Sequence, residues 1–339
     1  METSIRSAAV KPGPRAGRAL AVLPAVAAMA YPFWLQAAHA LDGPARALAL
    51  LGALAMPLAS AAAWMRIAAV PPGSVRERRA RCLALLAFAA PPGFVFLSFA
   101  LRMLGQPLPE VLAWVILWAV AAAWAAAADA TTPVGAGRRP DAAARVVHGG
   151  VAVLVLAFVA FHLVNHLVGW LGPQAHASVM HWGRRIYRTP AVEVLLVMGL
   201  LLQIGLGARL ASRWGAQGVD RYRAAQIATG VYVGFFLLAH MNSALVSARL
   251  LNGVETDWAW ASAAPVGLLD DAWSIRLVPH YGLGVFCVLS HLACGLRAVL
   301  LAHGWQRAPV DRAWRVALVL AGVLALLIVA GLCGLRVVT

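Results

Sequence analysis

Nine stretches of this chain are strongly apolar and nearly free of charge, and each has about 20 residues or more. A helix needs roughly 20 such residues to cross the ~30 Å hydrocarbon core of a bilayer. With 62% hydrophobic and 12% charged residues, little chain remains for a soluble domain. The sequence therefore predicts an all-α, polytopic membrane bundle. The stretches cover about 19–41, 45–70, 81–104, 110–128, 143–171, 190–211, 223–251, 280–303 and 312–336.

The basic residues predict the orientation of these helices. The formal net charge is +15, but in a membrane protein such charge marks cytoplasmic loops before it suggests nucleic acid. A cytoplasmic N-terminus places most of the 28 Lys and Arg residues inside, and nine crossings then put the C-terminus outside. Arg184, Arg185 and Arg188 are the exceptions, because they fall outside. We expect a multi-pass protein of a bacterial-type inner membrane, with lipid rather than nucleic acid as a partner.

Histidine divides the chain into two parts. The first four predicted helices contain only His39, whereas residues 143–303 carry the other nine histidines. A segment rich in Gly, Pro and Arg, near Thr131 to Asp141, separates the two parts. Pro91 and Pro92 are expected to kink or interrupt the third helix. We predict a basic cytoplasmic tail (1–18), a four-helix membrane extension (19–130), a cytoplasmic linker (131–141) and a five-helix membrane domain (142–339).

Two histidines of the second part are expected to meet inside the membrane. By the ~1.5 Å rise per residue, His162 and His240 both lie about 24 Å from the cytoplasmic starts of their helices. Ionisable groups at such depth are expensive unless they face the bundle interior and bind something. Two imidazoles on facing helices are the usual ligands of a b-type haem iron. Alternatively, each histidine makes only an interhelical hydrogen bond.

Other pairs of histidines have spacings that bear on metal binding. His162 and His166 lie four apart on one helical face and could chelate a metal, but no acid or cysteine joins them nearby. His148 and His162 are fourteen apart, and no second helix repeats that spacing. His291 lies deeper, about 16 Å below the outer face, where Gln203 is the matching residue of a neighbouring helix.

Residues 141–339 resemble the membrane-anchor cytochrome b subunit of succinate dehydrogenase and fumarate reductase, in its single-chain, five-helix form. The order, direction and spacing of four short motifs carry the resemblance. They are Arg145-Val-Val-His148-Gly-Gly, Phe161-His162-Leu-Val-Asn-His166-Leu, Gln226-Ile-Ala-Thr229-Gly230 with His240 ten residues further on, and Ser290-His291-Leu-Ala-Cys-Gly295-Leu-Arg297.

The resemblance implies that His162 and His240 are the axial ligands of the distal haem b and that His291 belongs to a proximal haem. Family members with two haems have a histidine four residues before the glycine that corresponds to Gly207, but this chain has Gln203 there. We therefore expect one haem and leave the second in doubt. His291 then binds a five-coordinate haem, recruits another ligand or is satisfied by a hydrogen bond with Gln203.

The resemblance also points to a quinone site on the outer side. Glu193 follows His181 by twelve residues, as a glutamate near the family's quinone site follows a loop histidine, and could accept a proton during quinol oxidation. Alternatively, the negative charge of Glu193 only interacts with the positive end of the dipole of its helix, and Glu193 pairs with Arg188. His181, Arg184 and Arg185 could hold haem propionates or a quinone head group, or form an ordinary interfacial cluster.

These features predict a membrane cytochrome b subunit that carries electrons between quinone and a succinate dehydrogenase or fumarate reductase type of complex. The flavoprotein and iron-sulfur subunits that the resemblance implies would hold the remaining chemistry, so the chain is not expected to be catalytic alone. Two alternatives stay open. One is a membrane scaffold or transport-like protein without redox function, and the other is a stand-alone haem electron-transfer protein.

Overall fold

The computed structural model describes residues 14–129, 131–133 and 141–337, with side chains from residue 22 onward, and within these residues every regular element is a helix, without a β-strand. Within them, six helices are long and apolar enough to cross a membrane. The prediction of a multi-pass α-helical membrane protein is confirmed. The six are α2 (Gly43–Ile67), α6 (Ala142–Val168), α8 (Pro190–Gly215), α9 (Arg221–Met241), α11 (Leu277–Ala302) and α12 (Arg307–Leu332).

The third predicted helix is two helices. α3 (Val75–Phe88) and α4 (Ala90–Met103) are bent by 74° at Ala89, and counting them as one span raises the total to seven. Pro91 and Pro92 account for the break, because proline lacks an N–H and clashes with the preceding turn. α1 (Pro14–Ala40) and α5 (Glu110–Ala126) complete the predicted nine but are not among these seven. The predicted tail and linker lie largely outside the described residues.

Residues 172–189, expected as a connection between spans, contain a further helix beyond the C-terminal end of α6. This helix, α7 (Pro173–Tyr187), packs on α6 at Gly183, where a Cβ atom would lie 2.3 Å from the ring of Phe161. α9 continues into η2 (Asn242–Leu251), a π-helix, and the short α10 (Trp258–Ala261) follows. Long π-helices are rare and often mark functional sites.

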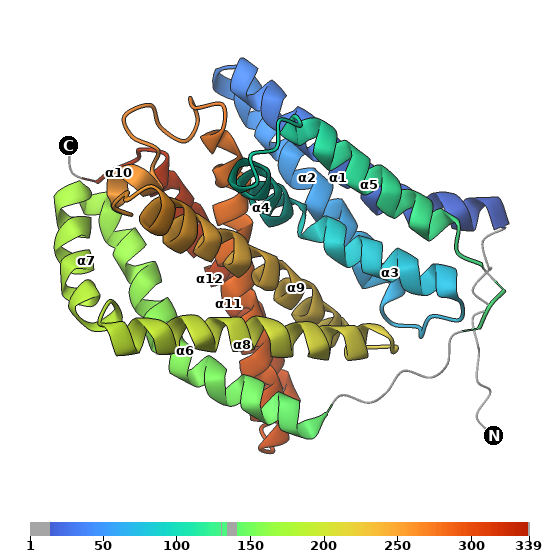
Figure 1. Ribbon diagram of the computed structural model, residues 1–339. Helices are drawn as coiled ribbons and strands as arrows, with labels where there is room; N and C mark the ends of the chain where they lie inside the picture. Colours follow the sequence, from blue (N-terminus) through green and yellow to red (C-terminus); the bar gives the residue numbers. More distant parts are fainter. Residues whose placement is uncertain (1–13, 130, 134–140, 338–339) are drawn as a thin grey trace.

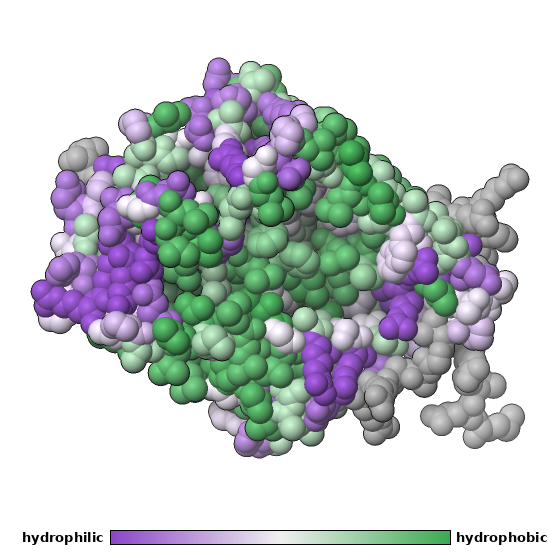
Figure 2. Space-filling view, viewed as in Figure 1, coloured by the Kyte–Doolittle hydropathy of each residue, from purple (hydrophilic) through white to green (hydrophobic). Residues whose placement is uncertain are grey.

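The two parts of the chain pack into one body (Figure 1). α1, α2, α3 and α5 form one side, α6, α7 and α8 form the other, and α9 and α11 lie between them. The Trp64 indole donates to the carbonyl of Ala224 at 2.9 Å, and buried Arg276 donates to Ser98 at 2.7 Å and pairs with Glu110. The view in Figure 2 shows a hydrophobic middle with a recess, and polar residues gathered towards the edges.

Candidate functional site

The C-terminal half of α6 brings His162 opposite His240 of α9. Their ring centroids are 5.9 Å apart and their planes cross at 69°. An imidazole nitrogen lies about 2 Å from its metal, so two rings on opposite sides of one iron have centroids roughly 6 Å apart. Within the described residues α6 packs on α8 and α12, and α9 on α8, α11 and α4, without extensive packing of α6 on α9. The two histidines thus face each other across the bundle at the spacing that one iron requires.

Each of these two rings is stacked on a phenylalanine one turn earlier in its own helix. Phe158 lies 5.6 Å from His162 with the planes 20° apart, and Phe236 lies 5.6 Å from His240 with the planes 15° apart. The sequence analysis missed these phenylalanines, although the spacing Phe-x-x-x-His occurs in both helices and would have indicated them. The stacking restricts the orientation of both imidazoles before any ligand binds.

Three more histidines surround the pair. His166 lies 4.7 Å from His162, His176 of α7 lies 5.8 Å from His166, and His280 lies 4.8 Å from the ring of Phe236. Even so, no group of three or more His, Cys, Asp or Glu residues is arranged to hold a metal ion in the described part of the chain. Chelation of a metal by His162 and His166 therefore finds no third ligand there.

His176 of α7 lies against the C-terminal end of α6. Asn165 of α6 hydrogen bonds to its Nε2 atom at 3.1 Å, and the ring of Trp258 lies 4.9 Å away. Burial lowers the pKa of His176, and the positive charge of Arg184 lowers it further. The fold at this end of α6, which α7 and α10 cover, therefore favours the uncharged imidazole.

The deeper His291 is not paired with Gln203. Its Nδ1 atom lies 3.0 Å from the carbonyl oxygen of Gln226, whereas the buried side-chain oxygen of Gln203 has no hydrogen-bond partner among the described residues. The alternative in which Gln203 satisfies His291 is therefore wrong. The main-chain carbonyl of Gln226, one turn before Gly230 on α9, occupies the hydrogen-bonding position next to the His291 ring instead.

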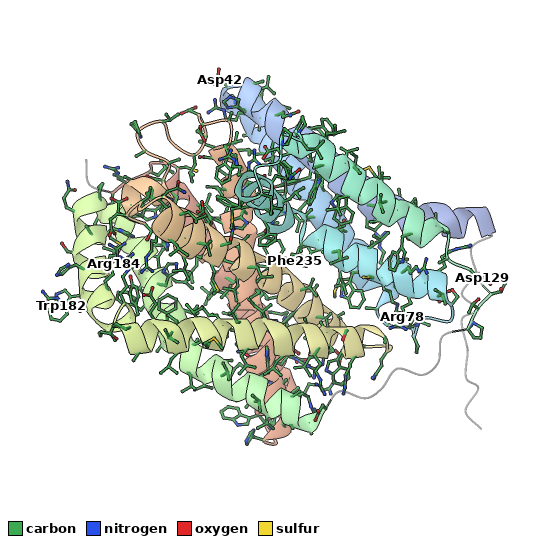
Figure 3. The ribbon with its side chains drawn as sticks, viewed as in Figure 1. Asp42, Arg78, Asp129, Trp182, Arg184 and Phe235 are labelled. Carbon is green, nitrogen blue, oxygen red and sulfur yellow. The ribbon has the colours of Figure 1, made fainter. Side chains whose placement is uncertain are left out.

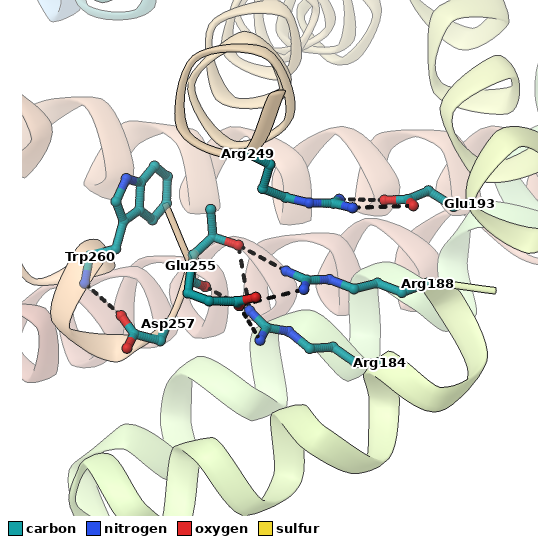
Figure 4. Close-up of polar contacts among 8 residues, drawn as sticks. Arg184, Arg188, Glu193, Arg249, Glu255, Asp257 and Trp260 are labelled. Atoms are coloured by element: carbon teal, nitrogen blue, oxygen red, sulfur yellow. Dashed lines mark hydrogen bonds and ion pairs between the residues drawn. The ribbon is translucent and has the colours of Figure 1, made fainter. Parts of the chain in front are cut away.

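Glu193 is paired, but with a different arginine from the one expected. Arg249 of η2 donates to both of its carboxylate oxygens, while Arg188 lies 3.5 Å from Glu255 and donates to Thr256 at 3.1 Å (Figure 4). The prediction of a pair with Arg188 is wrong, because η2 extends α9 far enough to bring Arg249 across α8. The pair joins α8 to the π-helix.

The predicted basic cluster on α7 is divided between two faces. Arg184 points to the loop after η2, where it pairs with Glu255 at 2.7 Å. His181 and Trp182 are exposed, and Arg185 stacks on Trp182 at 5.4 Å. Trp182 points away from the bundle (Figure 3). A role of His181, Arg184 and Arg185 towards propionates or quinone stays a prediction, and Arg184 would have to leave Glu255 to fulfil it.

A cavity of about 420 Å³ lies near His240. Ser243 and Ser247 of η2 line it on one side, and Tyr281, whose ring is 6.3 Å from that of His240, lines it on another. Phe99 and Arg102 of α4 also contribute to the wall. The cavity was not predicted from the sequence, since its walls come from both predicted parts of the chain.

Comparison of the chain with protein-family models, with curated proteins and with solved structures gives no significant match.

Proposed function

We propose that this protein is a membrane b-type cytochrome that exchanges electrons with quinone through a haem held by His162 and His240. The observation that carries the proposal is the 5.9 Å spacing of the two rings across the bundle. The orientation that we propose has nine crossings of a bacterial-type inner membrane and a cytoplasmic N-terminus. This orientation places the pair near the outer face.

The chain fits such a haem through its own residues. His162 and His240 would supply the two axial nitrogens. Their stacking on Phe158 and Phe236 restricts the orientation of both rings. The haem, when bound, supplies one-electron transfer between the two oxidation states of its iron.

The cavity next to Tyr281 is the quinone site that we propose. Its aromatic walls, Trp260, Trp273 and Tyr281, suit a flat ring, and the hydroxyl groups of Ser243 and Ser247 can donate to quinone oxygens. Tyr281 lies between the cavity and the ring of His240, so a quinone there would lie within one side chain of the haem ligand.

The partners that we propose are an iron-sulfur and a flavoprotein subunit on the cytoplasmic side. The basis is the resemblance of residues 141–339 to the succinate dehydrogenase and fumarate reductase anchor. In such a complex the present chain conducts electrons and binds quinone, while dicarboxylate chemistry belongs to the partners.

Substitution of the ligands tests the haem assignment. His162→Ala and His240→Ala should each remove the low-spin haem at this site, because loss of one axial ligand opens the iron. The measurement is the reduced-minus-oxidised spectrum and the haem-to-protein ratio of the purified membrane protein. His303→Ala, at the exposed end of α11, is the matched control and should leave both unchanged. An unaltered spectrum in both ligand variants, or protein without haem from haem-replete cells, would refute the proposal.

A further inference from the structure

We infer that the chain holds a second haem, between His148 and His291, in the cytoplasmic half of the bundle. This inference rests on the proposed function, because it extends a haem-binding bundle by one site. The sequence left His291 without a partner ligand, since Gln203 stands where a histidine is expected. The fold brings His148 of α6 to His291 instead.

The spacing of this pair matches that of the outer pair. The ring centroids of His148 and His291 are 6.3 Å apart, and their planes cross at 87°. Two imidazoles bound on opposite sides of one iron have centroids roughly 6 Å apart. Both pairs of the bundle therefore satisfy the same requirement, at two levels.

The hydrogen bonds of His291 involve Nδ1 and leave its Nε2 atom free to bind a metal. The Gln226 carbonyl, 3.0 Å from Nδ1, can only accept, so Nδ1 carries the proton and Nε2 keeps its lone pair. The hydroxyl of Thr229 lies 3.4 Å from the same Nδ1 atom. A bond from one ring nitrogen to a carbonyl is the arrangement that fixes a metal-ligating histidine in its tautomer.

His148 has a ring nitrogen that the protein leaves unsatisfied. Its Nδ1 atom is buried without a hydrogen-bond partner among the described residues. Gly207 of α8 faces it, at a distance where a Cβ atom would lie 3.5 Å from His148 Cε1. One turn earlier on α8, the buried Gln203 oxygen is also unpaired. Unpaired polar atoms in an apolar interior cost free energy, so their concentration around one pair of imidazoles indicates a polar group that the protein alone does not supply.

Close packing on the other side holds His291 against α9. A Cβ atom on Gly230 would lie 2.7 Å from His291 Cε1, so only glycine lets the ring lie this close to the helix backbone. Gly207 and Gly230 thus flank the two rings from two different helices. The second pair is built at the meeting point of α6, α8, α9 and α11.

The inference also explains the fourteen-residue spacing on α6. At ~1.5 Å per residue, His148 and His162 are about 21 Å apart along the helix, a large share of a ~30 Å hydrocarbon core. Their partner ligands come from two helices, His240 from α9 and His291 from α11, which is why no second helix repeats the spacing. A haem at each level forms a path for electrons from the cytoplasmic side to the outer site.

Basic residues lie at the cytoplasmic end of this site, where propionates would point. Arg145 precedes His148 by one turn on α6, and its charge acts on Arg223 of α9. Arg223 also donates to the side chain of Gln226, the residue whose carbonyl holds His291. Arg297 is less available, since it pairs with Asp311 at 2.7 Å and stacks on Tyr222.

The haem content of ligand variants of the full-length protein tests the inference. The pyridine haemochrome assay should give two haems per chain for the wild type. His148→Ala and His291→Ala should each give one haem, with the outer site retained, and His162→Ala should also give one. His303→Ala, at the exposed end of α11, is the control and should keep two.

The remaining outcomes distinguish failure of the second haem site from failure of the proposed function. One haem in the wild type, unaffected by His148→Ala and His291→Ala but lost in His162→Ala, would overturn the second site and leave the proposed function intact. No haem in the wild type would overturn both. Two haems in His148→Ala together with one in His291→Ala would show that His148 is not the partner ligand.

Two further measurements keep the test independent of folding defects. In His148→Gly and His291→Gly, added imidazole should restore the second haem, because the free ring replaces the missing ligand. Gly230→Ala should shift the spectrum of that haem alone, while Gly322→Ala, where a Cβ atom meets nothing within 4 Å, should not. Failure of imidazole to restore the haem in both variants, with the outer haem intact, would count against ligation by these residues.

Discussion

Unpaired polar atoms and a sterically restricted glycine lie around His148 and His291. His148 and Gln203 have buried polar atoms without partners in the described chain, and Gly230 has no room for a Cβ atom. From the sequence, the meeting of His162 with His240 was predictable because the helical rise fixes depth. The meeting of His148 with His291 was not, since it depends on which helices are neighbours.

The ring planes of the two pairs have a spectroscopic consequence at this scale. Planes that cross at 69° and 87° are far from parallel, so axial rings in these orientations would split the d orbitals of a bound iron only little. If the two pairs hold haem as we propose, both oxidised haems should show strongly anisotropic low-spin electron paramagnetic resonance signals.

His176, which α7 places against the C-terminal end of α6, makes the stability of the fold sensitive to acid. Its pKa is lowered in the fold, whereas the unfolded chain has the ordinary value of about 6.5. Between the two values the unfolded chain binds more protons, so the contribution of His176 is fully present above about pH 6.5 and is lost as the pH falls. The thermal midpoint in detergent should drop between pH 7 and pH 5, and the drop should be smaller in His176→Gln. An equal drop in both proteins would contradict this.

At the scale of elements, the positions of apolar helices followed from the sequence but their interruptions followed only in part. Pro91 and Pro92 predicted a break in this helix. The size of the bend, 74° between α3 and α4, also depends on the packing of α4 on α9, which the sequence does not show. α7 was missed because a helix that covers the end of a bundle lacks the long apolar run of a span. The π-helix η2 was missed because local residue preferences do not distinguish it from the end of α9.

The ion pair between α8 and η2 carries an element-scale prediction about proton transfer. Arg249 fixes Glu193 next to the helix whose other residues line the cavity. If this carboxylate accepts a proton from quinol, Glu193→Gln should slow quinol oxidation by about 10²-fold, the lower range for general bases, with an unchanged haem spectrum. The assay is steady-state quinol turnover.

Arg249→Gln is the matched control, because it breaks the same pair and keeps the carboxylate. Equal loss in both variants would mean that the pair matters only for joining α8 to η2.

In the whole molecule, the two parts of the chain contribute to one cavity. Phe99 and Arg102 come from the N-terminal extension, and Ser243, Ser247 and Tyr281 come from the five-helix domain. The sequence alone assigned no role to the extension. Its residues in the cavity wall make it part of the quinone site that we propose, and this depends on the packing of α4 on α9 and η2.

Filling this cavity should separate quinone binding from haem binding. Ser247→Phe places a large ring in the ~420 Å³ space and should raise the quinol KM at least about tenfold, while the haem-to-protein ratio stays at the wild-type value. Ser178→Phe, on the exposed face of α7, is the control. Unchanged quinol kinetics in Ser247→Phe would move the quinone site elsewhere.

The π-helix η2 also sets the direction in which Arg249 leaves the helix. A π turn bonds residue i to i+5, so it contains more residues than an α turn, and each residue turns less about the helix axis. If residues 242–251 closed as an α-helix of the same length, the difference would accumulate over the residues up to Arg249, and this side chain would turn away from Glu193. The hydrogen-bonding pattern of this segment, rather than the order of its residues alone, therefore decides whether α8 and η2 are joined.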